Sequence, residues 1–249
     1  MNLKMASRKI HRWLGLLMAL QIVAWMASGL WFSIFPIEEI RGEHLTRPAE
    51  GLELARLGQL AAPAAVQDAL DQHFGEAWQL AALELRRLEG QLYWRVSGSS
   101  GQKPFTRLVA ADEDRVAPML TAAAAESRAR DWLLTPAEPE AVEWVESVAP
   151  DGEIRGRELP VWKVSFEQPE SLSLYLDPWT GEILARRTAR WRVFDFFWML
   201  HIMDFDTRDD FNHPLLQVAA ALGLVIALSG IMLWVLTTRL LRNGRGQGG

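Results

Sequence analysis

Imidazole and carboxylate side chains gather in one short stretch near the carboxyl end of the chain. The stretch holds two histidines and four aspartates, namely His201, Asp204, Asp206, Asp209, Asp210 and His213. Because imidazole and carboxylate ligands together suit borderline metals such as iron or zinc, these residues form a candidate metal site. The alternative is an acidic turn in front of Pro214, in which Asn212 or His213 caps the helix that follows.

The rest of the chain offers few groups for catalysis. It contains five histidines and no cysteine, which excludes disulfides, thiolate catalysis and cysteine-ligated zinc or iron–sulfur sites. It has no glycine-rich phosphate loop and no nucleophile elbow, and no pair of carboxylates stands out as a general acid and base. His73 falls late in a predicted helix and is expected to be a surface or capping residue. The sequence therefore assigns no catalytic residue and leaves open whether the protein is an enzyme.

Two uncharged hydrophobic stretches frame the chain, residues 13–37 and residues 214–238, each of 25 residues. A bilayer core of about 30 Å needs roughly 20 helical residues to cross it, so both stretches are predicted to be transmembrane helices. The alternative for the first stretch is a cleaved signal peptide. Its apolar region is longer than the roughly 7–15 residues that a signal peptide uses, so an uncleaved anchor is expected.

Basic residues flank both stretches on the side of the chain termini. They are Lys4, Arg8, Lys9 and Arg12 before the first stretch, and Arg239, Arg242 and Arg245 after the second. The positive-inside rule therefore predicts a bacterial inner-membrane protein with both termini cytoplasmic and residues 36–213 periplasmic. With seven of the 26 basic residues in the flanks, the central segment carries 19 basic and all 31 acidic residues, a net charge of −12. Such a charge argues against a nucleic-acid partner.

The central segment is predicted to contain the same α+β unit twice, because Tyr-Trp-Arg-Val at 93–96 matches Val-Trp-Lys-Val at 161–164, at an offset of 68. The first unit is predicted to have a helix at 63–74, strands at 91–97 and 105–110 and a turn at 111–115. The second is predicted to have a helix at 121–134, strands at 160–166 and 171–176, a turn at 177–181 and a short strand at 182–185. Alternating apolar and polar residues favour half-buried antiparallel strands. Trp94 and Trp162 are expected to anchor the two cores.

Short motifs in and beside both hydrophobic stretches resemble one protein family. They are His11-Arg-Trp-Leu-Gly-Leu16 and Ser28-Gly29-Leu30 around the first stretch, Leu200-His201 before the second, and Leu228-Ser-Gly-Ile-Met-Leu-Trp234 within it. With the hairpin Leu174-Tyr-Leu-Asp-Pro-Trp-Thr-Gly-Glu-Ile-Leu184, they make nearly the whole chain similar to PepSY-associated transmembrane proteins. The resemblance implies a membrane α-helical hairpin of two transmembrane helices, with an extracytoplasmic α+β domain made of two PepSY-like units.

This fold class divides the chain into eight predicted segments. They are a cytoplasmic N-terminus (1–12), a first transmembrane helix (13–37), a linker (38–51), a first PepSY-like unit (52–120), a second PepSY-like unit (121–188), an interfacial amphipathic helix with an acidic turn (189–213), a second transmembrane helix (214–238) and a cytoplasmic tail (239–249). The interfacial helix is expected to place its aromatic residues at the level of the lipid headgroups.

The resemblance also implies a cofactor. Larger members of the family, with two such helix pairs, include inner-membrane siderophore and ferric reductases that hold b-type haem through membrane histidines. By resemblance, His11, His201 and His213 are the candidate haem ligands of this chain. It has one helix pair, and its acidic stretch after Leu200-His201 replaces the family's glycine-rich approach to the membrane. Both differences argue against a direct transfer of reductase activity to this chain.

Helix geometry limits how a haem could be held. A helix of 25 residues rises about 37 Å, so His11 and His201 cannot ligate the same haem within one chain. Ligation would need His201 with His213 in one chain, or equivalent histidines paired across a homodimer. Ala219, Gly223 and Ala227 lie four residues apart and give the second helix a face for close packing. That face packs either on another chain or on Gly15 and Ala19 of the first helix.

Two functions follow as expectations. The first is an accessory or haem-bearing component of iron, siderophore or flavin-linked membrane electron transfer. Its partners would be the lipid bilayer and either a second copy of the chain or a membrane redox protein. The second is a non-enzymatic periplasmic binding or regulatory module, such as a peptidase regulator, which grips a partner protein at an exposed strand edge.

Overall fold

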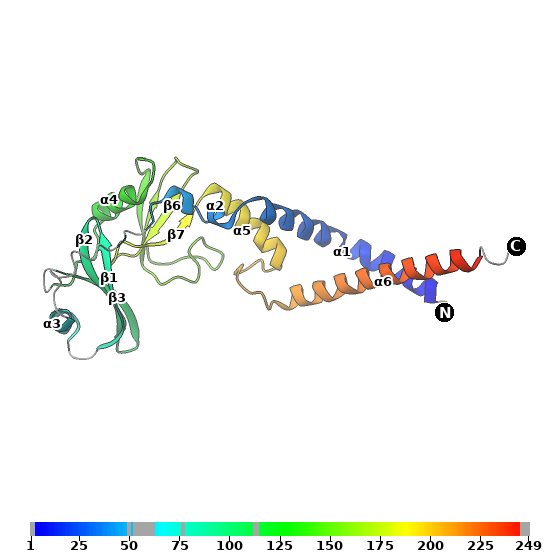
Figure 1. Ribbon diagram of the computed structural model, residues 1–249, viewed down its shortest axis with the longest axis horizontal. Helices are drawn as coiled ribbons and strands as arrows, with labels where there is room; N and C mark the ends of the chain where they lie inside the picture. Colours follow the sequence, from blue (N-terminus) through cyan, green and yellow to red (C-terminus); the bar gives the residue numbers. More distant parts are fainter. Residues whose placement is uncertain (1–2, 49–50, 52–62, 76–77, 112–114, 245–249) are drawn as a thin grey trace. The chain divides into compact units, whose positions relative to one another are not determined.

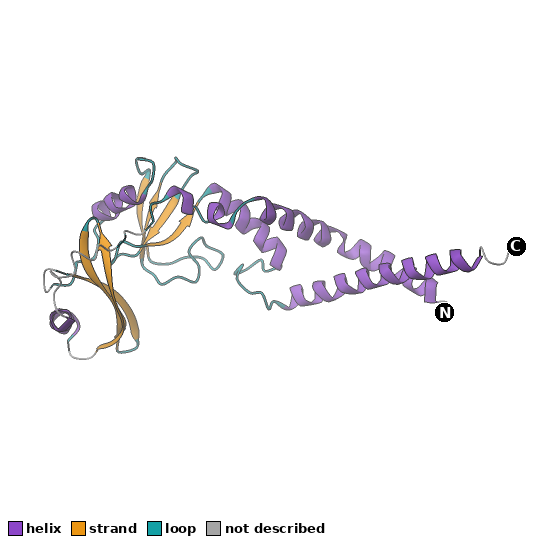
Figure 2. Cartoon of the chain, viewed as in Figure 1, coloured by secondary structure: helices purple, strands orange, loops and turns teal. Residues whose placement is uncertain are grey.

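The computed structural model describes the chain except for residues 1–2, 49–50, 52–62, 76–77, 112–114 and 245–249. The chain forms two compact units (Figure 1). The helical unit comprises Met1–Ile37 and Trp191–Gly249, and the sheet unit comprises Glu38–Arg190. Figure 2 shows that nearly all the regular structure of the helical unit is helix, whereas strands are confined to the sheet unit.

The helical unit is built on two long helices, α1 (Leu3–Ile34) and α6 (Pro214–Gly244). Both are long and apolar enough to span a membrane, over Met5–Ile34 and Pro214–Thr238, which confirms that the two predicted stretches form long apolar helices. The helix of α1 begins earlier than predicted and ends just before Pro36, a residue that interrupts helical hydrogen bonding. Leu16, Leu17 and Leu20 on α1 are 68–83% exposed. A helix with apolar side chains outside is suited to contact lipid.

Small residues let α6 pack closely on α1. Ala219 is buried in a cluster with Met18 and Ile226, and a Cβ placed on Gly223 would lie 3.6 Å from the Trp25 ring. Packing on the first helix, one of the two predicted alternatives, therefore accounts for these two small residues. Ala227, the third member of the predicted face, is exposed.

A shorter helix, α5 (Ala189–Ile202), occupies most of the predicted interfacial segment. Its aromatic residues contact α1: Phe32 lies 4.7 Å from Phe194, and Trp31 lies 5.7 Å from Phe197, measured between ring centroids. The helix is therefore held by packing on α1, with aromatic pairs of the distance range that stabilises protein cores.

The sheet unit contains two antiparallel sheets. Two short elements lead into it, α2 (Ile37–Ile40) and η1 (Glu43–Leu45). The first repeat comprises α3 (Pro63–Phe74), β1 (Trp78–Leu88), β2 (Gln91–Ser100) and β3 (Lys103–Ala110), with strand order β1-β2-β3. The second comprises α4 (Ala122–Trp132), β4 (Ala141–Val145), β5 (Val161–Ser165), β6 (Ser173–Leu176) and β7 (Ile183–Arg187), with strand order β4-β5-β6-β7.

Both repeats run from a helix into an antiparallel meander, as the sequence repeat predicts. Trp94 of β2 pairs with Val109 of β3, and Trp162 of β5 pairs with Leu176 of β6, so the two tryptophans occupy matching strands. Both pack against the core of their own repeat.

The sequence did not predict the first strand of each repeat, β1 and β4. In β1 the reason is its alanine, leucine, glutamate and arginine content, which favours helix. Residues 112–114 of the turn predicted at 111–115 lie outside the described residues.

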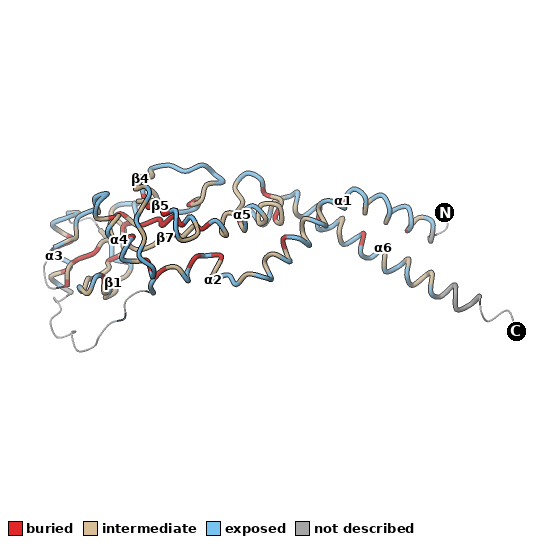
Figure 3. Tube along the Cα trace, turned by 90° about the horizontal axis from the view of Figure 1, so that it is seen from above, coloured by how far each residue is buried: buried red, intermediate tan, exposed pale blue. Residues whose placement is uncertain are grey.

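The core of the second repeat lies between α4 and its sheet. Ala125 and Ala129 on α4 lie four residues apart, on one face of the helix, and pack on Leu174 and Leu176 of β6. All four residues are fully buried. Figure 3 shows buried residues concentrated in the strands of this sheet.

The turn after β6 matches its prediction. The Asp177 side chain accepts hydrogen bonds from the backbone N–H of Trp179 at 2.9 Å and of Thr180 at 2.7 Å. Gly181 closes the turn with a φ of 68°, a conformation that glycine adopts without strain. The turn also helps to join the repeats, because Arg107 of β3 lies 3.6 Å above the Trp179 ring and Arg95 of β2 pairs with Glu182 at 3.0 Å.

Replacing Leu174 by alanine tests this core. Leu174 is fully buried, so we expect Leu174→Ala to lower the free energy of unfolding by about 2 to 5 kcal/mol. The measurement is thermal unfolding of the full chain in detergent. Leu134→Ala is the matched control, because Leu134 is 52% exposed and its loss should cost about 0.5 kcal/mol or less. Equal unfolding temperatures for the two variants would contradict the packing described.

Candidate functional site

His11 joins α1 to α6 through its ring nitrogen Nδ1. This atom lies 3.1 Å from the backbone oxygen of Ile226 and 3.0 Å from Oγ of Ser229. The carbonyl oxygen of Ile226 can only accept a hydrogen bond, so Nδ1 carries the proton. A Cβ on Gly230 would lie 3.1 Å from Cε1 of His11, so the missing side chain lets the ring approach α6.

His201 joins α5 to α1 in the same way. Its Nδ1 lies 2.7 Å from Oγ of Ser28, and that hydroxyl donates to the backbone oxygen of Ala24 at 2.7 Å. With that hydroxyl bonded to Ala24, the serine oxygen can accept from Nδ1–H, and we assign the ring proton to Nδ1. Trp25 adds a second contact, because its Nε1 donates to the backbone oxygen of His201 at 2.7 Å.

The two histidines thus share one arrangement. Each donates from Nδ1–H to the serine of a Ser-Gly pair on another helix, Ser229-Gly230 for His11 and Ser28-Gly29 for His201. Each therefore carries the lone pair on Nε2, and no hydrogen bond joins Nε2 of either ring to the described residues. An imidazole fixed through Nδ1–H, with Nε2 available, is the form in which histidine ligates metals.

Burial favours the neutral form of the His201 imidazole. It lowers the pKa of the His201 imidazole, so the ring is neutral at neutral pH. Apolar rings surround it, with Phe32 at 5.6 Å and Trp198 stacked at 6.5 Å between centroids.

The two histidines lie far apart along α1. His201 is bonded to Ser28, which follows His11 by 17 residues of continuous helix, a rise of about 25 Å. One haem cannot bridge that distance, in agreement with the sequence-based argument.

His213 has a different role from the other two. Its Nδ1 accepts a hydrogen bond from the backbone N–H of Leu215 at 3.3 Å, directly after Pro214 at the start of α6. His213 therefore caps the helix, as the capping alternative predicts. Because Nδ1 is the acceptor, the proton of the neutral ring lies on Nε2, and this tautomer presents no lone pair there. Ligation of one haem by His201 and His213 in one chain gains no support.

Asp204 organises the acidic turn from its centre. Its carboxylate accepts hydrogen bonds from the backbone N–H groups of Asp206, Thr207, Asp209 and Asp210 at 3.0–3.1 Å and from Oγ1 of Thr207 at 2.6 Å. Burial alone would raise the pKa of Asp204. The hydrogen bonds outweigh burial and hold the pKa of Asp204 well below its usual range. Within the described ranges, no group of three or more histidine and acidic side chains is placed to hold a metal. The six-residue metal hypothesis therefore gains no support.

A buried ion pair between α5 and this turn was not predicted. Asp195 on α5 is 4% exposed, and its Oδ2 lies 2.6 Å from Nη1 of Arg208. Trp198 adds a hydrogen bond from Nε1 to the backbone oxygen of Arg208 at 3.0 Å. A single aspartate among the aromatic residues of α5 is the signal that could have pointed to such a pair.

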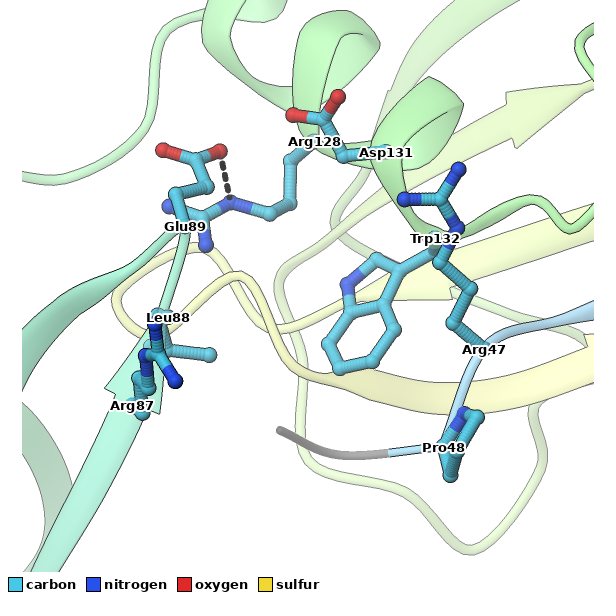
Figure 4. A pocket seen from close by; sticks show the side chains of 8 residues that line it. All are labelled: Arg47, Pro48, Arg87, Leu88, Glu89, Arg128, Asp131 and Trp132. Carbon is cyan, nitrogen blue, oxygen red and sulfur yellow. Dashed lines mark ion pairs between the residues drawn. The ribbon is translucent and has the colours of Figure 1, made fainter. Parts of the chain in front are cut away.

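The sheet unit carries a cavity of about 470 Å³ that the sequence also did not reveal (Figure 4). It is lined by Arg47, Pro48, Arg87, Leu88, Glu89, Arg128, Asp131 and Trp132. These residues come from three separate segments: the stretch after η1, the end of β1 with the turn that follows, and α4. One ion pair crosses the cavity rim, between Nε of Arg128 and Oε1 of Glu89 at 3.1 Å.

Replacing Asp204 tests the turn. We expect Asp204→Asn to destabilise residues 204–210 by roughly 1 to 3 kcal/mol, because an amide nitrogen cannot accept the backbone N–H groups. The measurement is amide hydrogen exchange of this segment. Asp206→Asn is the control, since the Asp206 side chain is exposed and makes no hydrogen bond to the described residues. Loss of protection in both variants alike would contradict the role of Asp204.

The pH dependence of the same segment is a second test. The lowered pKa means that the stabilisation is complete above the ordinary aspartate pKa of about 3.9 and is lost as pH falls through the folded value. Amide protection should therefore persist from about pH 7 to about pH 5 and fall only in strong acid. A loss of protection already between about pH 7 and pH 5 would contradict this assignment.

The comparisons with known proteins identify one family. The family model described as the PepSY-associated TM region matches residues 8–248, which include the Ser-Gly pairs, both bonded histidines and the sheet unit. In the comparisons with curated proteins and with solved structures, no protein matches the chain. With two apolar helices long enough to span a bilayer and a family match over almost its whole length, the chain is a membrane protein of the PepSY-associated TM family.

Proposed function

We propose that this chain is a haem-bearing component of membrane electron transfer, in which His11 and His201 would each supply one ligand to a haem b. The single observation that carries the proposal is the state of the two rings. Both are fixed by Nδ1–H on a serine of another helix, and both keep the Nε2 lone pair. Ligating histidines in metalloproteins are oriented by a second bond of this kind.

The surroundings of His11 suit the charge of a haem. A cavity of about 520 Å³ beside it is lined by Arg8, Lys9 and Arg12, with Met5 and Leu233 as apolar wall. Haem carries two propionate groups, which these cations can neutralise, and an apolar macrocycle, which the methionine and leucine can contact.

Each ring supplies one ligand, so a haem with two histidine ligands needs a second source. Because His11 and His201 lie about 25 Å apart along α1, the second ligand comes from another copy of the chain or from a membrane redox partner. A homodimer would contain two histidine pairs: the two copies of His11 and the two copies of His201. Bound there, haem b would supply reversible one-electron transfer, while this chain holds and orients the ligating nitrogens.

The proposed orientation in the membrane rests on the positive charges near the two chain ends. The basic residues in the first turns of α1 and after the apolar part of α6 favour cytoplasmic termini and a periplasmic sheet unit in an inner membrane. The His11 position would then lie near the cytoplasmic face and the His201 position near the periplasmic face. Electron transfer linked to iron, siderophore or flavin chemistry is the proposed physiological context.

Optical spectroscopy of the whole protein tests the proposal. We expect the full chain, expressed with ample haem supply and purified in detergent, to show Soret and α-band changes between reduced and oxidised states. A colourless preparation would overturn the haem proposal.

Substitutions then test which residues hold the haem. His11→Ala and His201→Ala should each lower the haem retained per chain, whereas the control His213→Ala should not. Ser28→Ala and Ser229→Ala keep the imidazoles but remove an oxygen that orients them, so haem affinity should fall about 10- to 100-fold. Unaltered spectra in both histidine variants would refute the ligand assignment.

A second candidate is a binding or regulatory module, and one observation favours it. Strand β1 lies at the edge of its sheet and runs for 11 residues, with Leu80 55% exposed. A long edge strand can accept an extended segment of a partner protein. A colourless full chain would favour this candidate.

A further inference from the structure

The cavity of the sheet unit gathers positive charge from segments far apart in the sequence. Arg47 follows η1, Arg87 lies near the end of β1, and Arg128 lies on α4. Two acidic residues, Glu89 and Asp131, line the same cavity. The lining therefore carries three guanidinium groups and two carboxylates, a net positive charge in a segment that is acidic as a whole.

An aromatic ring forms the middle of the cavity wall. Trp132 donates from Nε1 to the backbone oxygen of Gly181 at 3.0 Å, so the polar edge of its indole is already bonded. Figure 4 shows the ring between Arg47 on one side and the Arg128–Glu89 pair on the other, with Leu88 across the space. The wall thus offers an apolar surface beside cationic groups.

Arg47 is the cation best placed to receive a ligand. Its backbone N–H donates to the oxygen of Trp132 at 2.8 Å, which fixes its main chain against the end of α4. The neighbouring Thr46 is buried and accepts from Nε of Arg186 at 2.7 Å. The Arg47 guanidinium, by contrast, makes no hydrogen bond or ion pair with any residue in the described part of the chain. The hydrogen-bonded backbone at Arg47 therefore presents at the cavity a guanidinium whose donors are not used by the described residues.

We infer that this cavity binds a small organic anion with a flat apolar body, and that its ligand class is the aromatic carboxylates. A volume of about 470 Å³ lies in the range of small-molecule sites, roughly 300–1,000 Å³. The guanidinium fork matches the two oxygens of a carboxylate, and the indole face of Trp132 stacks with an aromatic ring. The inference is independent of the haem proposal, because every residue that it uses lies in the sheet unit.

Three probes test whether binding at the cavity depends on the negative charge of the ligand, on its aromatic body, or on both. They are 2-naphthoate, its uncharged counterpart 2-naphthamide, and inorganic phosphate. Equilibrium dialysis is carried out on the full chain in lipid nanodiscs, with empty nanodiscs as the blank. We expect saturable binding of one naphthoate per chain, about tenfold weaker binding of naphthamide, and no displacement of naphthoate by an equal concentration of phosphate.

A matched pair of variants places the site. Arg47→Gln should weaken naphthoate binding about tenfold, because it removes the charged donors that meet the carboxylate. Its control is Arg41→Gln, since the Arg41 side chain is 63% exposed, lies in the same stretch of chain and does not line the cavity. Neither arginine side chain belongs to a core, so both variants should fold as the parent does.

Three results would overturn the inference. They are equal binding of naphthoate and naphthamide, full displacement of naphthoate by an equal concentration of phosphate, and unchanged naphthoate binding in Arg47→Gln. The haem spectrum of Arg47→Gln should equal that of the parent chain, so failure here is distinguishable from failure of the haem proposal.

Discussion

The hydrogen bond from a histidine Nδ1–H to a serine on another helix is the interaction on which the helical unit depends. It occurs twice, His11 to Ser229 and His201 to Ser28, and ties α1 both to α6 and to α5. Away from water, a polar group without a partner is costly, so each bond fixes how one helix is rotated against the other. The same bond selects the tautomer and leaves Nε2 available. The orientation of the helices and the proposed ligation by Nε2 thus both depend on this hydrogen bond.

This arrangement gives the serine and glycine of each Ser-Gly pair a physical context. A serine supplies the acceptor, and at Gly230 the missing side chain supplies the space that the His11 ring needs. His213 illustrates the contrast: it directly precedes α6, and its Nδ1 accepts the Leu215 N–H and caps that helix. The three histidines of the helical unit therefore divide into two whose Nε2 makes no hydrogen bond to the described residues and one that stabilises a helix end.

Much of the fold was predictable from residue patterns, and the reasons are local. Uncharged runs define α1 and α6, and the match between 93–96 and 161–164 marks β2 and β5. β1 was missed because its residues favour helix and only pairing with β2 makes it a strand. The Ser28–His201 bond and the arginine cavity join segments far apart in the sequence, so no local pattern could reveal them. The acidic stretch suggested a metal site, yet the Asp204 carboxylate is occupied by backbone N–H groups.

The central claim is that His11 and His201 each give Nε2 to a haem whose second ligand comes from another histidine. Low-temperature electron paramagnetic resonance of the oxidised full chain tests it most directly. The account predicts a low-spin ferric signal typical of two histidine ligands, reduced in part by His11→Ala and in part by His201→Ala. A high-spin signal, or no haem signal at all, would contradict it.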